Sequence, residues 1–198
     1  MSIEKFRNKY TIKSDRLEGY DYSQNGIYFV TICAKNREYF FGSIENGRMC
    51  LTDIGKIANE FWKEIPKHFP FVILDEFIVM PNHVHGIIEI CNKADACRDE
   101  ALPRLYIGKY PLMSKMSPKQ KSLSVIVGSF KAVVSKISNK KFPDVNFQWQ
   151  SRFYDHIIRN DESLDKIREY VQINPKMWEQ DKNKLEASIE ASMEASKL

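Results

Sequence analysis

The sequence is short of cysteine, and it contains no long hydrophobic run. No two of its four cysteines (Cys33, Cys50, Cys91 and Cys97) have the two-residue spacing of metal-binding pairs, so we expect reduced thiols and no structural zinc site. No apolar run approaches the roughly 20 residues that span a bilayer. The polar start, Met1 to Tyr10, does not match a secretory signal. We therefore expect a cytoplasmic protein with no membrane partner.

Acidic residues are absent from a long central stretch. Between Arg104 and Lys141 there is no Asp or Glu, whereas nine basic residues occur there: Arg104, Lys109, Lys115, Lys119, Lys121, Lys131, Lys136, Lys140 and Lys141. A stretch of one charge sign is a candidate phosphate-binding surface, and the interleaved Tyr106 and Tyr110 favour nucleic acid. The alternative is a solvated face whose acidic partners lie elsewhere, and the net charge of +4 is only weak evidence for nucleic acid.

The elements that the sequence does contain indicate an α+β protein. Hydrophobic content of 43% and charged content of 28% are ordinary for a soluble globular chain. Runs of β-branched and aromatic residues predict strands at 27–34, 71–80 and 83–90, with shorter segments at 147–150 and 153–158. Asn46-Gly47 between the runs Tyr39 to Ile44 and Arg48 to Leu51 predicts a hairpin. Helical spacing predicts helices after Thr52, after Ser122 or Ser124, and from Asn160. This order indicates an antiparallel sheet with helices packed on one face.

The chain divides by composition into an arm, a domain and a tail. Residues 1–25 form a polar N-terminal arm, and residues 26–178 form the domain. Residues of about 92–118 carry no clean period and contain three prolines, so we interpret them as a loop insertion. Residues 179–198 form a charged C-terminal tail, whose repeats of Glu-Ala-Ser favour a frayed helix or disorder.

The stretch Met80-Pro81-Asn82-His83-Val84-His85-Gly86 is the main candidate site. It holds two of only four histidines, and it joins two predicted strands. Because side chains alternate along a strand, His83 and His85 point to the same face and Val84 to the other. Two imidazoles placed in this way can bind one metal ion or one phosphate. The alternative is a pair of hydrogen-bonded structural histidines, and we expect the remaining two, His68 and His156, to be structural, with contact to DNA as an alternative for His156.

The last predicted helix carries a second candidate group. Tyr170 and Asn174 are four residues apart and therefore share one helix face. Taken alone, Tyr170 is typical of amphipathic packing, and Asn174 before Pro175 is typical of a helix end.

Several motifs together resemble the single-tyrosine HUH transposases, and the REP-associated tyrosine transposase branch in particular. They are HVH after MPN, the segment WQSRFYDHIIR, Tyr-x-x-x-Asn-Pro on the late helix, and the runs GYDYSQNGIYFVTIC and DEFIVMPNHVHGIIEI. The resemblance extends from about Leu17 to Trp178. It implies a ferredoxin-like (RRM-like) sheet, a divalent metal (Mg²⁺ or Mn²⁺) bound by His83, His85 and Asn174, and Tyr170 as a nucleophile that forms a 5′-phosphotyrosine with single-stranded DNA.

The resemblance also implies a substrate, namely hairpin-forming palindromic repeats in single-stranded DNA. The candidate DNA contacts are Arg16, Tyr20, Tyr22, Lys121, Lys131 and Arg152. Packing is an equally good interpretation of the tyrosines of the arm. We expect a monomer or a homodimer. Two other functions stay open: an RRM-like module that binds single-stranded nucleic acid without cutting it, and a metallohydrolase that attacks with bound water.

Overall fold

The computed structural model describes residues 20–91 and 121–178. Arg16, most of the predicted arm, the predicted insertion and the predicted tail lie outside the described residues. Among the helices in the described ranges, none has the length and apolar character needed to cross a bilayer.

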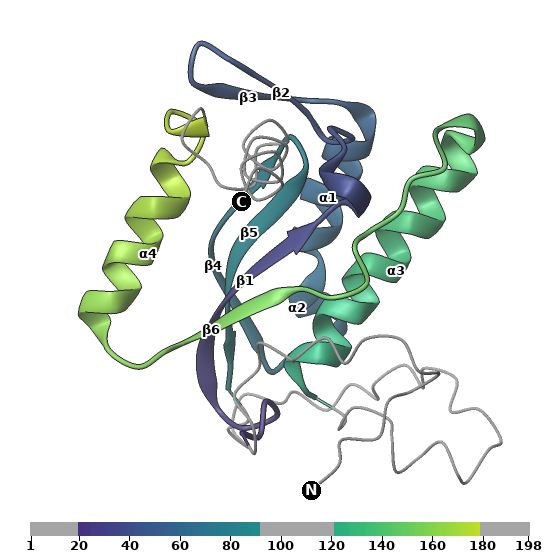
Figure 1. The fold of residues 1–198 in the computed structure, drawn as a ribbon. Coiled ribbons are helices and arrows are strands. Elements are labelled where there is room, and N and C mark those ends of the chain that lie inside the picture. Colours follow the sequence, from purple (N-terminus) through teal and green to yellow (C-terminus); the bar gives the residue numbers. More distant parts are fainter. Residues whose placement is uncertain (1–19, 92–120, 179–198) are drawn as a thin grey trace, which may run out of the picture.

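A four-stranded sheet forms the centre of the molecule (Figure 1). Its strands are β1 (Gly26–Cys33), β4 (Val72–Met80), β5 (His83–Ile90) and β6 (Tyr154–Ile158). The spatial order is β4-β5-β1-β6, and every neighbouring pair is antiparallel. Helix α1 (Asp53–Lys63) connects the first two of these strands, and α3 (Leu123–Lys141) connects the last two. This order of strands and crossover helices is the ferredoxin-like arrangement, so the predicted fold class is confirmed.

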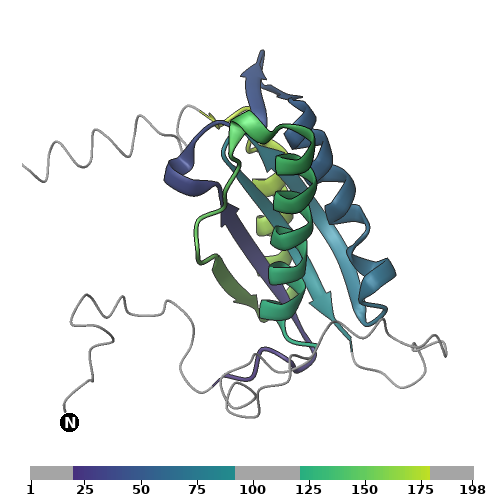
Figure 2. The same ribbon diagram turned by 90° about the vertical axis from the view of Figure 1, so that its right-hand side faces the viewer.

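One face of the sheet, here called the core face, is covered by α1 and α3. Figure 2 looks onto this side, with the two helices next to each other in front of the strands. The strand residues that point toward them are fully or almost fully buried: Tyr28, Val30, Ile32, Val84 and Ile88. On the same face, the absence of a side chain at Gly86 leaves room for the ring of Trp62, because a Cβ at this position would lie 2.2 Å from Trp62 Cζ2. The core face therefore has close apolar packing.

The opposite face, here called the α4 face, is contacted by α4 (Asp161–Ile173). Leu164 and Ile167 of this helix pack with Ile87, Ile158 and Phe29, in a second and smaller apolar cluster. Figure 1 shows α4 on the other side of the sheet from α3. Helices thus pack on the core face as predicted, and the sheet has a further helix behind it.

Local sequence explains where the elements begin. Thr52 Oγ1 accepts a hydrogen bond from the Gly55 amide at the start of α1, and Asn160 Oδ1 accepts one from the Ser163 amide at the start of α4. Both are ordinary N-caps. The hairpin strands β2 (Gly42–Glu45) and β3 (Arg48–Leu51) flank Asn46-Gly47, and both turn residues have positive φ, as a two-residue hairpin turn requires. Three short helices complete the fold: η2 (Lys35–Arg37), α2 (Ile65–His68) and η4 (Pro143–Val145).

Two predicted strand segments are shorter than expected. The first hairpin strand begins at Gly42 rather than Tyr39, because the amide of Phe41 bonds to the Pro81 carbonyl instead of to the hairpin partner. Residues 147–150 form a single bridge, between Trp149 and Ala34, rather than a strand. The other predicted strands and helices lie within one or two residues of their observed limits.

Candidate functional site

His83 and His85 lie together on the α4 face. Their ring centroids are 4.3 Å apart, and the side chains are 0% and 2% exposed. The intervening Val84 points into the core face and is fully buried. The alternation predicted from the sequence is therefore present, and it brings two imidazoles within reach of one small ligand.

A chain of hydrogen bonds fixes which nitrogen of His83 carries the hydrogen. Asn82 Nδ2 donates to the Arg37 carbonyl at 3.0 Å, which fixes the orientation of the Asn82 amide. The Asn82 Oδ1 that faces His83 Nδ1 at 2.8 Å is then an acceptor, so Nδ1 must donate. Burial, and secondarily the charge of Arg37, lowers the pKa of His83 to about 3. His83 is therefore a neutral imidazole with its lone pair on Nε2, the form that binds metals.

His85 is oriented by three neighbours. Its Nδ1 lies 2.9 Å from Thr31 Oγ1 on the adjacent strand β1, and its ring stacks on Phe29 at a centroid distance of 5.2 Å. On the other side of the ring, Nε2 lies 3.3 Å from the hydroxyl of Tyr170. The structure thus brings the predicted nucleophile to one of the two predicted metal-binding histidines.

The position of Tyr170 depends on how α4 is attached to β4. The register of β4 shifts between Leu74 and Phe77, which is a β-bulge. Two consecutive residues at the bulge both bond to α4: Asp75 accepts from Arg168 Nε at 3.0 Å, and Glu76 accepts from Gln172 Nε2 at 3.1 Å. In a regular strand two consecutive side chains would point to opposite faces.

These two attachments lie on either side of Tyr170 in the helix. The hydrogen bonds from Arg168 hold the pKa of the Asp75 carboxyl below its usual value, so the ion pair is present at neutral pH. Tyr170 remains 37% exposed. Its hydroxyl is therefore held against His85 while its ring stays accessible to a large ligand.

Asn174 is buried at the end of α4, the helix that carries Tyr170. It follows α4 and is 2% exposed, and its Oδ1 has no hydrogen-bond partner among the described residues. In the chain it lies between two residues that touch the histidines: Tyr170 contacts His85, and Trp178 stacks on His83 at a centroid distance of 6.1 Å. A buried amide oxygen that bonds to no protein donor is costly unless a ligand takes the role.

The donor set fits a divalent cation. Two imidazoles and one amide oxygen are acceptable ligands for Mn²⁺ and, with additional water, for Mg²⁺. The described residues contain no group of three or more His, Cys, Asp and Glu side chains suited to a metal. A site here would accordingly take its third protein ligand from Asn174, an amide, rather than from a carboxylate.

The predicted DNA contacts do not all gather at this site. Tyr20 and Tyr22 form an aromatic cluster with Tyr28, with centroid distances of 4.9 to 6.5 Å, so their packing role is clear. Lys131 lies on α3 and donates to the Gln150 carbonyl at 2.6 Å, and burial lowers its pKa. The ammonium group of Lys121 lies over the Phe71 ring at 5.5 Å.

Arg152 is exposed in the segment that leads into β6. Arg16 lies outside the described residues. β6 is the outer strand beside β1, so Arg152 lies at the edge of the sheet rather than at the histidine pair.

The residues that orient the site were not among the predicted site residues. The sequence could have indicated a role for Asn82, because it directly precedes His83 in the Met80–Gly86 stretch. No local sequence pattern indicates Thr31 or Asp75. The register of β1 against β5 places Thr31 beside His85, and the bulge in β4 places Asp75 beside α4.

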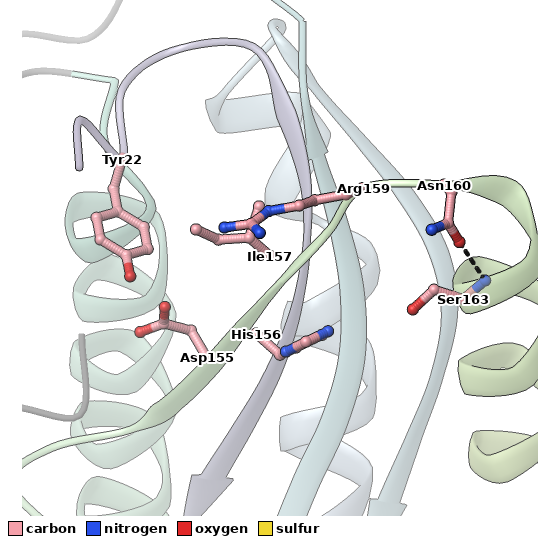
Figure 3. A pocket seen from close by; sticks show the side chains of 7 residues that line it. All are labelled: Tyr22, Asp155, His156, Ile157, Arg159, Asn160 and Ser163. Carbon is pink, nitrogen blue, oxygen red and sulfur yellow. Dashed lines mark hydrogen bonds between the residues drawn. The ribbon is translucent and has the colours of Figure 1, made fainter. Parts of the chain in front are cut away.

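A separate pocket of about 390 Å³ opens at the outer edge of β6. Figure 3 views it from that edge, and Asp155 points toward Tyr22 while His156 points to the other side of the strand. Arg159 and Asn160 belong to its lining, and neither His83 nor His85 does. The pocket is therefore distinct from the histidine pair.

Comparisons with known proteins give sequence relatives and a structural neighbour. No protein-family model matches the chain. An uncharacterized protein of Haemophilus influenzae is 40% identical over 176 residues, which cover 85% of this chain and 91% of that protein. A second protein of the same organism, named a REP-associated tyrosine transposase, is 23% identical over 157 residues, covering 78% of this chain and 73% of that protein.

Among solved structures, a REP-associated tyrosine transposase bound to a REP hairpin matches with a TM-score of 0.50. The identity is 18%, and the match covers 82% of this chain and 73% of the other. At this identity the likeness concerns the fold, and it agrees with the order of strands and helices described above.

Proposed function

We propose that this chain, which resembles the REP-associated tyrosine transposases in sequence and in fold, cuts and rejoins single-stranded DNA with Tyr170 as the nucleophile. The proposal includes a divalent metal, Mg²⁺ or Mn²⁺, held by His83, His85 and Asn174. The observation that carries it is the distance of 3.3 Å between the Tyr170 hydroxyl and His85 Nε2.

In the proposed step, the phenolic oxygen of Tyr170 attacks the scissile phosphorus. The oxygen gives up its proton to solvent, and a new phosphorus–oxygen bond forms while the bond to the 3′ oxygen breaks. The 3′ oxygen takes up a proton and leaves as a hydroxyl, and the 5′ phosphate stays on Tyr170. The number of phosphodiester-type bonds is unchanged, so another 3′-hydroxyl can attack the 5′-phosphotyrosine, restore the phenol and join two strands.

The residues around Tyr170 support this assignment. A bound divalent cation would polarise the phosphate and neutralise part of its charge. His83 is neutral, and its Nδ1 is engaged by Asn82, which leaves Nε2 as the ligand atom. The buried Asn174 Oδ1 supplies an oxygen that lacks another described partner. The bonds from Arg168 and Gln172 to β4 hold the helix of the nucleophile against the sheet.

The proposed substrate is a single-stranded DNA hairpin. The transposase of the neighbouring solved structure is bound to a REP hairpin. For this chain the corresponding ligand is a palindromic repeat that folds on itself, with the cleaved phosphate in single-stranded DNA beside it. An exposed Tyr170 is compatible with so large a substrate.

The test is an adduct assay on labelled hairpin DNA taken from the flanks of the gene. We expect wild-type protein with Mn²⁺ or Mg²⁺ to give a covalent protein–DNA species on a denaturing gel. Chelator, Tyr170→Phe and His83→Ala should each abolish it. Tyr154→Phe is the matched control, because Tyr154 is also an exposed tyrosine, 44% against 37%, and it should form the adduct normally.

The other outcomes identify the alternative functions. Binding of single-stranded hairpins without an adduct, on every hairpin tested, would identify a module that binds DNA without cutting it. Cleavage that survives Tyr170→Phe and leaves no adduct would identify a metal-activated water as the nucleophile. Either result contradicts the proposal.

A further inference from the structure

The outer strand β6 carries exposed aromatic side chains on the α4 face. Tyr154 pairs with Thr31, and Thr31 pairs on its other side with His85. Directly opposed residues in antiparallel strands point to the same face, and Thr31 Oγ1 bonds to His85. Tyr154 therefore lies on the face that carries the histidines, two strands away from His85.

His156 occupies the next position on the same face. It pairs with Phe29, whose ring stacks on His85 and lies 6.1 Å from that of Tyr170. Figure 3 shows His156 pointing away from Asp155 and Tyr22, toward the side of α4. The register thus gives a row of rings that runs from β6 across Phe29 to the candidate nucleophile.

These two aromatic residues of β6 are not used to pack the protein. Tyr154 is 44% exposed, and His156 is also exposed. The apolar cluster of the α4 face is formed instead by Ile87, Ile158 and Leu164. Tyrosine on an edge strand is ordinary, but two neighbouring exposed rings beside a candidate nucleophile form a surface on which planar ligands can stack.

Positive charge gathers at the start of β6. Arg152 is exposed two residues before Tyr154. Lys131 Nζ lies against the carbonyls of Gln150 and Ser151, and Lys35 Nζ bonds to Gln148 Oε1 at 2.8 Å. The acid of this strand, Asp155, points to the opposite face. Arg152 and Lys35, both exposed, therefore place positive charge near one end of the row of rings, a combination that binds single-stranded nucleic acid.

We propose that the DNA strand carrying the scissile phosphate crosses the α4 face over β6 and β1, with bases stacked on Tyr154 and His156 and phosphates near Arg152. This inference rests on the proposed function for its substrate. Adjacent strands are about 4.8 Å apart, so Tyr154 lies about 10 Å from His85. A base on Tyr154 is therefore close enough for a nearby phosphate of the same strand to reach Tyr170.

The experiment measures binding separately from cleavage. All proteins carry Tyr170→Phe, and chelator is present, so neither the nucleophile nor a metal contributes. The probe is a fluorescein-labelled oligothymidylate, which forms no hairpin, and the readout is fluorescence anisotropy as a function of salt. The added changes are Tyr154→Ala, His156→Ala and Arg152→Ala, with thermal unfolding followed for each protein.

Two control variants separate stacking from other effects. Tyr154→Phe keeps the ring and removes only the hydroxyl. Ile73→Ala shortens another exposed apolar side chain, 53% exposed, on the edge strand β4 at the other side of the sheet. Both controls should bind the probe within about twofold of the parent.

We expect Tyr154→Ala and His156→Ala each to weaken binding by about 5- to 150-fold, the range for loss of one base-stacking ring. Arg152→Ala should weaken binding and reduce the salt slope by about one unit, as expected for one lost phosphate contact. The melting temperatures should stay near that of the parent, because these side chains are exposed.

The inference is overturned if both alanine variants of the rings bind like the parent, or if Tyr154→Phe loses as much affinity as Tyr154→Ala. Its failure is distinct from failure of the proposed function. Normal adduct formation together with unaffected binding by the ring variants would remove the DNA path and leave the function. No adduct together with weakened binding would support the path on a module that does not cut.

Discussion

The two faces of the central sheet differ sharply, although the same strands form both. On the core face, β1 and β5 present hydrophobic side chains and two glycines, Gly26 and Gly86. On the α4 face, the same two strands present Thr31, His83 and His85, all nearly buried. Successive residues of β5 alternate between the two faces: His83 and His85 lie on the α4 face, and Val84 and Gly86 lie on the core face.

The side chains of the two faces have different roles. Apolar burial on the core face stabilises the fold. Buried polar groups on the α4 face contribute little net stability and require a partner for every donor and acceptor. The sheet can thus hold a polar site rigidly because its other face is packed independently. Changes on the core face should alter stability, and changes on the α4 face should alter metal binding or chemistry.

The largest expected effect is on the core face. Trp62 is fully buried against Phe130 and Phe77, with ring centroids 5.2 and 5.7 Å away. Trp62→Ala should reduce the free energy of unfolding by about 3–5 kcal/mol, measured by urea denaturation. Trp62→Phe, which keeps an aromatic ring, should lose less. The comparison of the faces would fail if Trp62→Phe kept its stability but lost affinity for Mn²⁺.

An intermediate effect is expected from the group that orients His85. Thr31→Val keeps the shape of the side chain and removes the hydroxyl 2.9 Å from His85 Nδ1. We expect affinity for Mn²⁺ to fall about 10- to 100-fold, as for other groups that hold a metal-binding histidine, by isothermal titration calorimetry. Thr31→Ser keeps the hydroxyl and should bind almost normally. Equal loss in both variants would mean that packing, not the hydrogen bond, matters at this position.

The smallest effect is expected from the attachment of α4 to the sheet. Asp75→Asn removes the charge that attaches Arg168 of α4 to the bulge of β4. Adduct formation should slow by about tenfold or less, because a partly exposed ion pair contributes about 1 kcal/mol, while affinity for Mn²⁺ stays unchanged. The measurement is single-turnover adduct formation at saturating DNA.

Asp165→Asn is the matched control for this variant. Asp165 also bonds to Arg168, at 3.0 Å, but it belongs to α4 itself and does not attach the helix to the sheet. Its adduct formation should match that of wild type. A similar slowing in both variants would show that the charge near Arg168, rather than the attachment to β4, controls the rate.

Much of the fold could be predicted from the sequence, because local signals and the final structure agree. Thr52 and Asn160 cap their helices, and Asn46-Gly47 turns the hairpin. The alternation of His83, Val84 and His85 required only that β5 be a strand. These features depend on residues within a few positions of one another, and periodicity detects them.

The features that escaped prediction depend on residues far apart in the chain. The Thr31–His85 contact requires the register of two strands, and the Asp75–Arg168 pair requires a bulge and a helix 93 residues later. Lys131 looked like a phosphate contact in a stretch without acids, yet its ammonium group is taken up by backbone carbonyls of residues 150 and 151. Composition cannot reveal such long-range partners.

The antiparallel order of the sheet also determines when the candidate site is completed. β1 begins at residue 26, and its outer partner β6 ends at residue 158. The contact between Tyr170 and His85 joins residues that are 85 positions apart in the chain. Contacts of such sequence separation close late in folding, and a ribosome delivers the N-terminal part first. On the proposed mechanism, a nascent chain holds its histidines before it holds its nucleophile, so the capacity to attack DNA arises only after α4 with Tyr170 has been synthesised and has packed on the sheet.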